Sequence, residues 1–451
     1  MIILPFLLTF YVKNNIILCS DKEVILMQKP KGTYDIYGNK AEQMLYFRKL
    51  AETLMNMYNA KYFETPIFES SELFHRGVGE TTDIVSKETY DFKDRGDRNL
   101  TLRPEGTAGI VRCFIENKLY AENLPLKAWY YGPMFRYERP QAGRHREFYQ
   151  FGLEAFGTYD PIMDAEVISI LVNLFKLLGL KGIKVNINTL GDKESRENYR
   201  EALISYFKPY INDLCDDCQN RFEKNPLRIL DCKVDGEKDI MKCAPKITDY
   251  LNDESKKHFD KVKEYLDAMD INYVVNPNIV RGLDYYTHTV FEVEADIEGF
   301  GSQNVLGAGG RYNNLVENIG GPSIPGVGFA IGVERLLLAL EMEGIDIRES
   351  STPEIYVIPM GDECKSKSMN LVNTLRLNGF RVEMDYNNRN LKSNFKNADK
   401  LNVKYIIIVG EDEINTKILT IKDNYSKEEY KVNVYELIDF LDEKLGDNDE
   451  N

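Results

Sequence analysis

The sequence lacks most of the features that would mark a membrane protein or a repeat protein. No apolar stretch in its 451 residues is long enough to cross a bilayer, which takes about 20 residues. The nearest candidate, residues 1–12, has no basic segment before it and is therefore not typical of a signal peptide. Internal repeats are absent. We expect a cytoplasmic protein with no membrane partner. Residues 1–27 are interpreted as a spurious N-terminal extension with Met27 as the native start; the alternative is a real apolar appendage.

Positive charge is also scarce, because 57 lysines and arginines face 72 acidic residues and leave a net charge of −15. Nucleic-acid-binding proteins usually carry a basic surface, so the balance predicts weak non-specific binding to nucleic acid. A local basic strip can still act within an acidic protein. Residues 376–404 offer one, with seven basic residues against three acidic ones, although such a strip alone is more typical of an ordinary solvated surface.

Cysteine is sparse as well, with seven residues in the chain. Cys215 and Cys218 have a spacing found in zinc sites, whereas Cys232 and Cys243 follow singly. The pattern leaves two interpretations open, a structural zinc ion or reduced cytosolic thiols, and we favour the thiols and predict no metal site. A redox pair fits less well, because the CDDC segment lies in a charged helical region and does not follow a strand.

The length predicts two or three domains. Residues 28–345 read as a mixed α/β core. Within it, residues 192–268 are amphipathic helices with dense charge, which indicates a helical insertion. Residues 346–353 form a linker, and strand and helix patterns alternate through residues 354–451, which predicts an α/β domain with a buried sheet. This last part contains no catalytic motif.

Three arginines occur in segments that are otherwise apolar or rich in tyrosine: Arg136, Arg281 and Arg335. We expect them on a strand, at a strand entrance and at a helix start. A guanidinium group keeps its charge at neutral pH, and its fixed fork of N–H donors suits phosphate. Together the three arginines predict a site for a polyphosphate such as ATP.

Residues 134–138 and 148–155 are predicted to form two strands joined by the polar loop 139–146. Because strand side chains alternate between faces, Phe135, Tyr137, Tyr149, Phe151, Leu153 and Ala155 are expected on the core face. The other face would carry Arg136, Glu138, Phe148, Gln150, Gly152 and Glu154, with the glycine leaving room for a ligand close to the sheet. The plainer alternative is a solvated polar face with ordinary salt bridges.

These segments resemble the class II aminoacyl-tRNA synthetases, and within that class the histidyl-tRNA synthetases. The hairpin is similar to motif 2, residues 325–341 to motif 3, residues 65–74 to motif 1, and residues 281–293 to the signature of the histidine-specific members. Segments 28–36, 100–109 and 307–315 also match, and the resemblance runs from about residue 27 to residue 445. It implies an α+β catalytic core with an antiparallel sheet, a helical insertion that faces the tRNA acceptor arm, and a C-terminal anticodon-binding α/β domain.

The resemblance also implies an activity. L-Histidine would react with ATP, accompanied by Mg²⁺, to give histidyl-adenylate and pyrophosphate, and histidine would pass to the 3′ end of tRNA(His) in a homodimer formed through motif 1. The resemblance implies that Arg281 and Arg136 are the catalytic residues. ATP would bind Arg136, Glu138, Phe148 and Arg335. Histidine would bind Glu105, Gly106, Thr107, Arg136, Gln150, Glu154, Arg281, Tyr285 and Tyr286. Asn313 stands where the family usually has aspartate.

In the loop 139–146, the resemblance assigns Arg139 and Gln141 to the extra nucleotide at the acceptor end of histidine tRNAs. Arg144 and Arg146 fit phosphate contacts and a solvated loop equally well. Two alternative functions remain for this chain. It could be a regulator of ATP phosphoribosyltransferase, like an inactive relative of the synthetases, or a tRNA-binding module without catalysis. That regulator lacks the C-terminal α/β domain and the arginine block, whereas this sequence contains both, the block at residues 281–293.

Overall fold

The computed structural model describes residues 27–79, 82, 84–232, 234–300, 304–348 and 352–446. The chain divides into two compact units between Ile347 and Arg348, and each is described by itself. Within the described residues, no helix has both the length and the apolar character needed to cross a membrane. The interpretation of residues 1–26 as an extension falls outside the described part of the chain.

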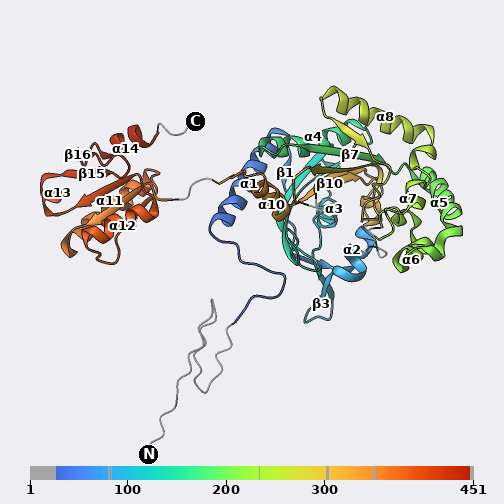
Figure 1. Ribbon diagram of the computed structural model, residues 1–451, viewed down its shortest axis with the longest axis horizontal. Coiled ribbons are helices and arrows are strands. Elements are labelled where there is room, and N and C mark those ends of the chain that lie inside the picture. The colour runs from blue at the N-terminus through green and yellow to red at the C-terminus, as the bar shows by residue number, and fades with distance from the viewer. Residues whose placement is uncertain are drawn as a thin grey trace, which may run out of the picture. The chain divides into compact units, whose positions relative to one another are not determined.

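The first unit is built on a large sheet (Figure 1). It has eight strands in the order β1-β5-β6-β11-β10-β9-β7-β8. The strands are β1 (Lys61–Tyr62), β5 (Leu126–Phe135), β6 (Glu147–Phe156), β7 (Ile183–Thr189), β8 (Tyr273–Val275), β9 (Thr287–Ala295), β10 (Val305–Arg311) and β11 (Gly326–Gly332). Only the outermost pairs, β1 with β5 and β7 with β8, are parallel. The antiparallel sheet predicted for the core is therefore confirmed.

One face of this sheet is covered by helices. They are α1 (Asn39–Met57), α4 (Ile162–Leu177), α8 (Asp253–Ala268) and α10 (Val333–Met342). Their apolar side chains share one buried cluster with Phe151 and Leu153 of β6 and Phe329 of β11. The alternation predicted for β6 is correct, because its odd-numbered residues pack into this cluster while Gln150 and Glu154 lie on the other face of the strand, within the candidate site.

The first strand of the predicted hairpin lies earlier than expected. β5 ends at Phe135, so Arg136 follows the strand, and Tyr137, which was expected in the core, is 54% exposed. The space beside Gly152 was expected to admit a ligand. It is filled by the ring of Tyr130, so a side chain of the protein takes the place that the glycine leaves.

The opposite face of the sheet carries smaller elements. Helix α3 (Thr107–Glu116) packs there with Tyr130, Tyr286 and Tyr312 in a second buried cluster. Beside it lie α2 (Ser71–Val78), α9 (Leu315–Asn318) and a three-stranded sheet in the order β2-β4-β3, made of β2 (Phe68–Ser70), β3 (Tyr90–Lys93) and β4 (Asn99–Leu102). The candidate site lies on this face.

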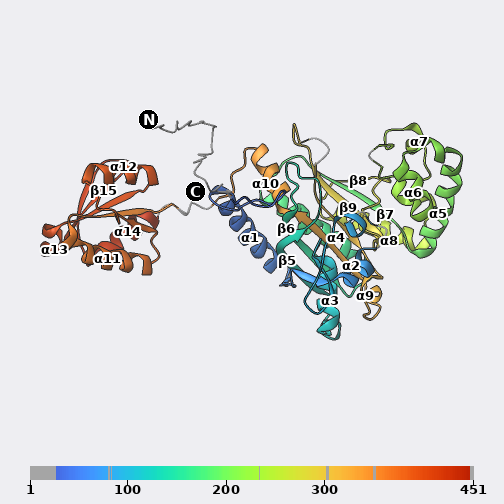
Figure 2. The ribbon, with the colours of Figure 1, turned by 90° about the horizontal axis from the view of Figure 1, so that it is seen from below.

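Between β7 and β8 the chain is helical. Helices α5 (Lys193–Phe207), α6 (Asp216–Lys224) and α7 (Asp239–Lys242) lie together at one end of the first unit (Figures 1 and 2). They enclose a small apolar cluster of their own. Helix α8 behaves differently, because its Phe259, Val262 and Leu266 belong to the core cluster with α4. The separate helical part is thus shorter than the range 192–268 read from the sequence.

The second unit has a five-stranded sheet in the order β13-β12-β14-β15-β16. Its strands are β12 (Ile355–Pro359), β13 (Val382–Met384), β14 (Tyr405–Val409), β15 (Ile418–Asp423) and β16 (Glu429–Asn433), and its helices are α11 (Asp362–Leu377), α12 (Leu391–Leu401), α13 (Glu411–Thr416) and α14 (Leu437–Gly446). Apolar clusters on both faces of the sheet bury β12 and β14, as the alternating pattern predicted.

Candidate active site

A cavity of about 260 Å³ opens on the face of the large sheet opposite α4 and α8. Its lining draws on the loop before α3, β6, the segment before β9, β10, β11 and the first turn of α10. Most residues predicted for the site line it together: Glu105, Thr107, Arg136, Glu138, Phe148, Gln150, Glu154, Arg281, Tyr285, Tyr286 and Arg335. Gly106 lies directly beside it, since its N–H donates to Gln150 Oε1 at 3.0 Å.

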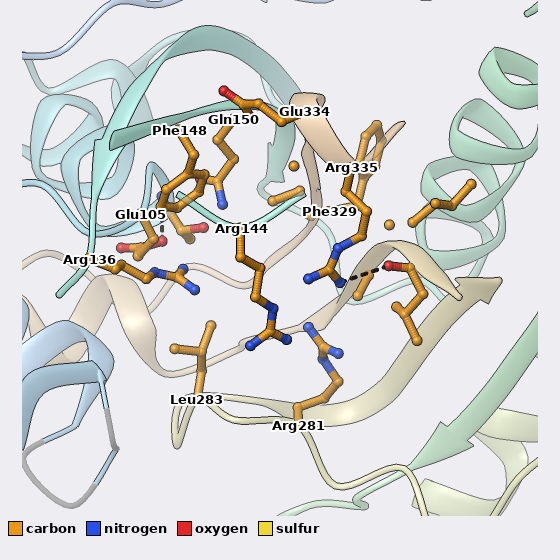
Figure 3. A pocket seen from close by; sticks show the side chains of 18 of the residues that line it. Glu105, Arg136, Arg144, Phe148, Gln150, Arg281, Leu283, Phe329, Glu334 and Arg335 are labelled. Atoms are coloured by element: carbon orange, nitrogen blue, oxygen red, sulfur yellow. Dashed lines mark hydrogen bonds between the residues drawn. The ribbon is translucent and has the colours of Figure 1, made fainter. Parts of the chain in front are cut away.

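The three arginines identified in the sequence share this cavity although they come from distant parts of the chain. Figure 3 shows their guanidinium groups directed into the same space, with Arg144 between them. Arg136 donates from Nε to Pro104 O at 2.8 Å, and its Cζ lies 5.3 Å from the centroid of the Phe148 ring. Arg335 donates from Nη1 to Val305 O at 3.1 Å, which holds the side chain across β10.

Positive charge is concentrated at this end of the cavity. Burial, then Arg144 and Arg136, lower the pKa of Arg335, while Glu138 acts in the opposite direction. Glu138 is the nearest counter-charge, with its carboxylate 3.2 Å from Arg144 Nη1 and 3.7 Å from Arg136 Nη1. One carboxylate among several guanidinium groups is an arrangement that favours binding of an anion.

Arg281 lies in the segment between β8 and β9 and has a positive φ of 64°. Its side chain forms an ion pair with Glu292 of β9 and lies beside the ring of Tyr286. Its Nε is buried and has no hydrogen-bond partner in the part of the chain that the structure describes. A guanidinium group with an unused donor, facing a cavity, has capacity left for a ligand.

The other end of the cavity holds two buried carboxyl groups. Glu154 accepts hydrogen bonds from Thr107 Oγ1 at 2.7 Å and from Tyr312. Burial raises the pKa of Glu154 to about 8, against the effect of these two hydrogen bonds. Glu105 accepts from the backbone N–H groups of Thr107 at 2.7 Å and Ala108 at 2.8 Å, at the N-terminus of α3. This end therefore offers hydrogen bonds instead of net positive charge.

Some lining residues were not predicted. Tyr312 lies in the glycine-rich segment 307–315, which resembles the family, but only the fold brings its hydroxyl to Glu154. Gly328 of β11 faces Glu154 across the strand pair, and a Cβ at that position would overlap Glu154 Oε2. Arg144, which was left between two interpretations, lines the cavity, whereas Arg146 stacks on Tyr137 with its Cζ 3.8 Å from the ring centroid.

The two residues assigned to the tRNA acceptor end lie elsewhere. Arg139 and Gln141 are not among the residues that line the cavity. The backbone of Gln141 pairs with that of Arg144 at 2.9 and 3.1 Å, which folds the loop back on itself. Arg144, at the other side of this turn, lines the cavity, and the proposed contact of Arg139 and Gln141 with the tRNA stays a prediction.

A second cavity, of about 370 Å³, lies between the helical insertion and the core and shares Arg281, Leu283 and Tyr286 with the first. Glu197 and Asp284 are the acidic residues of its lining. The basic residues are more numerous: Lys193, Arg196, Arg200, Lys224, Arg228 and Arg281. The second cavity is thus a mainly basic path between insertion and core that adjoins the first cavity at Arg281.

Comparison with known proteins assigns the chain to a family. The sequence model described as histidyl-tRNA synthetase matches residues 33–336, more than half of the chain. The chain belongs to the histidyl-tRNA synthetase family. A model described as anticodon binding domain matches residues 354–444, which contain the sheet of the second unit. The resemblance stated from the motifs is therefore confirmed.

Relatives of the histidyl-tRNA synthetase family match nearly the whole chain. The histidine–tRNA ligase of Bacillus cytotoxicus is 51% identical over 420 residues, covering 93% of this chain and 99% of the relative. That of Lysinibacillus sphaericus is 50% identical over 416 residues, covering 92% and 99%. The crystal structure of apo S. aureus histidyl-tRNA synthetase has a TM-score of 0.79 and 41% identity, covering 92% of this chain and 99% of that one.

A regulatory relative shares the fold as well. The structure named ATP phosphoribosyltransferase regulatory subunit/histidyl-tRNA synthetase, from Bacillus halodurans, is 20% identical with a TM-score of 0.60. At this identity the likeness concerns the fold alone. The fold alone therefore does not distinguish between the two named functions, and the residues of the cavity must do so.

Proposed function

We propose that the chain is a histidine–tRNA ligase, which activates L-histidine with ATP and transfers it to the 3′ end of tRNA(His). The observation that carries the proposal is the shared cavity of Arg136, Arg281 and Arg335, which lies next to the hydrogen-bonding pocket around Glu154. The three arginines suit a triphosphate, and the pocket around Glu154 suits a small polar side chain. The identity of 50% and 51% to curated histidine–tRNA ligases over 92% and 93% of this chain supports the same activity.

In the first step, a carboxylate oxygen of histidine attacks the α-phosphorus of ATP. An O–P bond forms, the bond from the α-phosphorus to the bridging oxygen breaks, and pyrophosphate leaves with the electron pair. Negative charge on the phosphoryl oxygens must be stabilised throughout, which makes catalysis mainly a matter of positioning and electrostatics. Arg136 and Arg281 would act on the α-phosphate, and Arg335, in the first turn of α10, would bind the γ-phosphate.

The adenine base would bind near Phe148, stacked on its ring, with Glu138 accepting a hydrogen bond from the base. The distance of 5.3 Å between Arg136 Cζ and the ring of Phe148 supports this arrangement, because it brings the aromatic surface next to the proposed α-phosphate contact. Magnesium is expected to enter with ATP as part of the substrate, since Mg²⁺ binds largely through phosphates and water.

The cavity carboxylates support this view of magnesium. Each of them already has partners: Glu105 has two backbone N–H groups, Glu154 has Tyr312 and Thr107, and Glu334 has Tyr34 and the N–H of Tyr149. Glu138 pairs with Arg144. Among the described lining residues, these groups do not form an all-protein magnesium site, and a magnesium ion would depend on the phosphates of ATP.

Histidine would be selected by hydrogen bonds to both ring nitrogens. Glu154 can accept from one N–H, since a carboxylate has acceptor sites beyond the two used by Thr107 and Tyr312. Tyr286 can donate or accept at the other nitrogen. An amino acid without these groups would leave buried polar atoms unpaired, and sites of this kind reject such analogues strongly. Glu105, Gly106, Thr107, Gln150 and Tyr285 would complete the pocket.

In the second step, a hydroxyl of the terminal ribose of tRNA attacks the carbonyl carbon of histidyl-adenylate, and AMP leaves. The basic path between insertion and core, which ends at Arg281, suits the phosphate backbone of the acceptor end. Arg139 and Gln141 remain proposed contacts to the extra nucleotide. The second unit, with its anticodon-binding match, would bind the other end of the tRNA.

We further propose a homodimer that forms through the motif 1 segment and acts in the cytoplasm, where tRNA and ATP are found. Phe68 and Phe92 support the interface, because they are 52% and 42% exposed and their rings lie 6.2 Å apart on the small sheet. Ile67, which directly precedes β2, is 45% exposed. Exposed apolar residues grouped in this way often mark a subunit contact. Sedimentation of wild type and Phe68→Asp tests it, since the variant should sediment as a monomer.

The experiment that tests the activity is pyrophosphate exchange. The purified chain is incubated with ATP, labelled pyrophosphate and each amino acid in turn, and label in ATP is measured. Exchange with histidine alone is expected. Histidine binding without exchange would support the regulatory function instead, and neither binding nor exchange would leave a tRNA-binding module. Charging of tRNA(His) in a second assay then tests the transfer step.

A further inference from the structure

The helical insertion contains a cluster of metal-binding side chains that the proposed activity does not use. It consists of Cys215, Cys218, Cys232 and Asp235, whose ligand atoms all lie within 4.8 Å of one another. Cys218 and Cys232 are buried, and Asp235 is 1% exposed. Cys243, the fourth cysteine of the region, is exposed and lies outside the cluster. The fold thus places an aspartate as a fourth potential ligand beside three cysteines, which could not be predicted from the cysteine spacing.

The spacing of these atoms suits a tetrahedral ion. Cys215 Sγ lies 3.6 Å from Cys232 Sγ, and Cys232 Sγ lies 3.8 Å from Asp235 Oδ2. Zinc bound to sulfur at about 2.3 Å in a tetrahedron places neighbouring sulfurs roughly 3.8 Å apart. A disulfide would need a sulfur separation of about 2.05 Å. The cysteines are free, and their separation matches shared coordination better than a bond between them.

The backbone holds the ligands in place. Cys215 precedes α6 and Cys218 lies in its first turn, which gives the two-residue spacing common in zinc sites. The other two ligands come from the turn that follows the short helical turn at Pro226–Ile229. In this turn the N–H of Asp235 donates to Cys232 Sγ at 3.4 Å, and the N–H of Cys215 donates to Asp235 Oδ2 at 2.9 Å.

Two further features fix this turn. The N–H of Gly236 donates to Cys232 O at 2.8 Å, and a Cβ at position 236 would lie 2.6 Å from that oxygen, so the close approach requires glycine. Lys238 Nζ lies 2.8 Å from Asp235 Oδ1, the oxygen that does not face the sulfurs. Partners of this kind around a ligand set orient the ligands toward one point.

The insertion also has a physical need for such an ion. Its described residues form no sheet, and its buried cluster is small. The cluster includes two of the ligands and consists of Tyr199, Leu203, Phe207, Leu214, Cys218, Ile229, Cys232, Met241, Ala244 and Ile247. Small folds with few buried apolar residues are commonly stabilised by a structural metal. An ion bound here would connect the start of α6 to the turn at residues 232–235 and close the cluster on that side.

We propose that Cys215, Cys218, Cys232 and Asp235 bind one structural zinc ion that stabilises the helical insertion. Three thiolates and one carboxylate form a soft, nitrogen-free and closed ligand set, which favours zinc over magnesium or calcium. The ion is not part of the ATP site. It acts on the fold of the insertion and not on the reaction, so the proposal does not depend on the proposed activity.

The first test uses the full-length wild type alone. The chain is purified under reducing conditions without chelators, and its metal content is measured by mass spectrometry. About one zinc per chain is expected, and a mercurial reagent that blocks thiols should release it to a colorimetric indicator. Zinc well below one equivalent, after growth in zinc-supplemented medium and dialysis against zinc, overturns the proposal. So does a Cys215–Cys232 disulfide in the peptide mass map of the freshly purified protein.

The second test compares variants within the insertion. Cys218→Ser and Asp235→Asn remove or weaken one ligand each, while Cys243→Ser changes an exposed cysteine outside the cluster and is the matched control. Competition with a chelator should show zinc affinity lowered about tenfold or more in the first two and unchanged in the control. Equal affinity in all three variants overturns the proposal. If Cys218→Ser fails to fold, Asp235→Asn and the wild-type metal content still decide it.

Discussion

Arg281 forms an ion pair with Glu292, which β9 presents on the same side of the sheet as the cavity. The backbone at Arg281 is left-handed, a conformation that a non-glycine residue adopts only when its surroundings enforce it. The pair fixes the direction of the guanidinium group, while the buried Nε remains without a partner among the described residues. The position of the Arg281 guanidinium group and its unused N–H donor are thus both fixed before any substrate binds.

The first prediction concerns this arginine. Arg281→Ala should lower histidine-dependent pyrophosphate exchange by about 10²–10³-fold, the usual effect of losing one donor to a developing negative charge. Arg281→Lys should restore only part of the rate, because an ammonium group cannot provide the same fork of donors. The rates are measured at saturating ATP and histidine.

Two further variants separate the charge from the backbone. Arg281→Gly should be as inactive as the alanine variant but more stable by about 1 kcal/mol, because glycine adopts the left-handed conformation without penalty. Arg98→Ala changes an exposed arginine that does not line the cavity, and this variant should exchange normally. Full activity in Arg281→Ala would contradict the assignment of this residue to the α-phosphate.

The hairpin and the three arginines show how much of the site could be read from the sequence. The period-two alternation of residues 148–155 was enough to separate the core side of β6 from the ligand side. Segment resemblance then identified the partners from other regions. Most of these residues line one cavity, and their individual roles stay predictions. The sequence pattern predicts the two faces correctly because side chains two residues apart in a strand point to the same face of the sheet.

The failures share a different cause. Tyr130 fills the space beside Gly152 from β5, the neighbouring strand of the same hairpin, which side-chain alternation alone does not predict. Tyr312 contacts Glu154 from a segment that is distant in sequence. Tyr137 was expected in the core because the end of β5 could not be read from its residues. Asp235 was not recognised as a neighbour of the cysteines because aspartate in a charged helical region gives no signal of its own.

The second prediction uses the glycine that faces Glu154. A methyl group at Gly328 would overlap Glu154 Oε2 and the backbone oxygen of Leu153, so Gly328→Ala should shift β6 at this point and displace the carboxyl group from the proposed imidazole contact. The KM for histidine in pyrophosphate exchange should rise about tenfold, equivalent to about 1.4 kcal/mol. Gly332→Ala is the control, because Gly332 lines the same cavity with no atom near its Cβ position, and it should keep the KM for histidine. An unchanged KM for histidine in Gly328→Ala would argue against this placement of the imidazole.

The third prediction concerns protons released on histidine binding. Burial raises the pKa of Glu154 to about 8, so in the empty site at pH 7 this carboxyl is mostly protonated. Accepting an imidazole N–H favours the ionised form and lowers that pKa, so binding should release close to one proton at pH 7. The release should fall toward zero as the pH rises above about 8, where the group is already ionised.

Calorimetry in buffers of different ionisation enthalpy measures the protons directly. Glu154→Gln keeps a hydrogen-bonding group without a titratable proton, and it should release only the small amount that histidine itself contributes near its own pKa. The comparison at pH 7 and pH 9 isolates the contribution of Glu154. Equal release by the wild type and Glu154→Gln at pH 7 would place the proton elsewhere.

The last prediction concerns the second unit. In the basic strip at residues 376–404, the arginines have partners within the unit: Arg376 binds Val382 O, Arg381 binds Glu354, and Arg389 binds Asp385. The lysines of α12 differ. Lys392, Lys396 and Lys400 are exposed and recur every four residues, so they share one face of the helix.

If this face contacts the phosphate backbone of tRNA, changing all three lysines to glutamine should raise the KM for tRNA(His) in charging. The slope of log KM against log salt should fall by about one for each lysine that contacts a phosphate. Pyrophosphate exchange does not involve tRNA and should be unchanged. A control with Lys365, Lys367 and Lys417 changed to glutamine removes the same charge from other parts of the unit. Equal effects of the two triple variants would mean that total charge, and not this face of α12, governs tRNA binding.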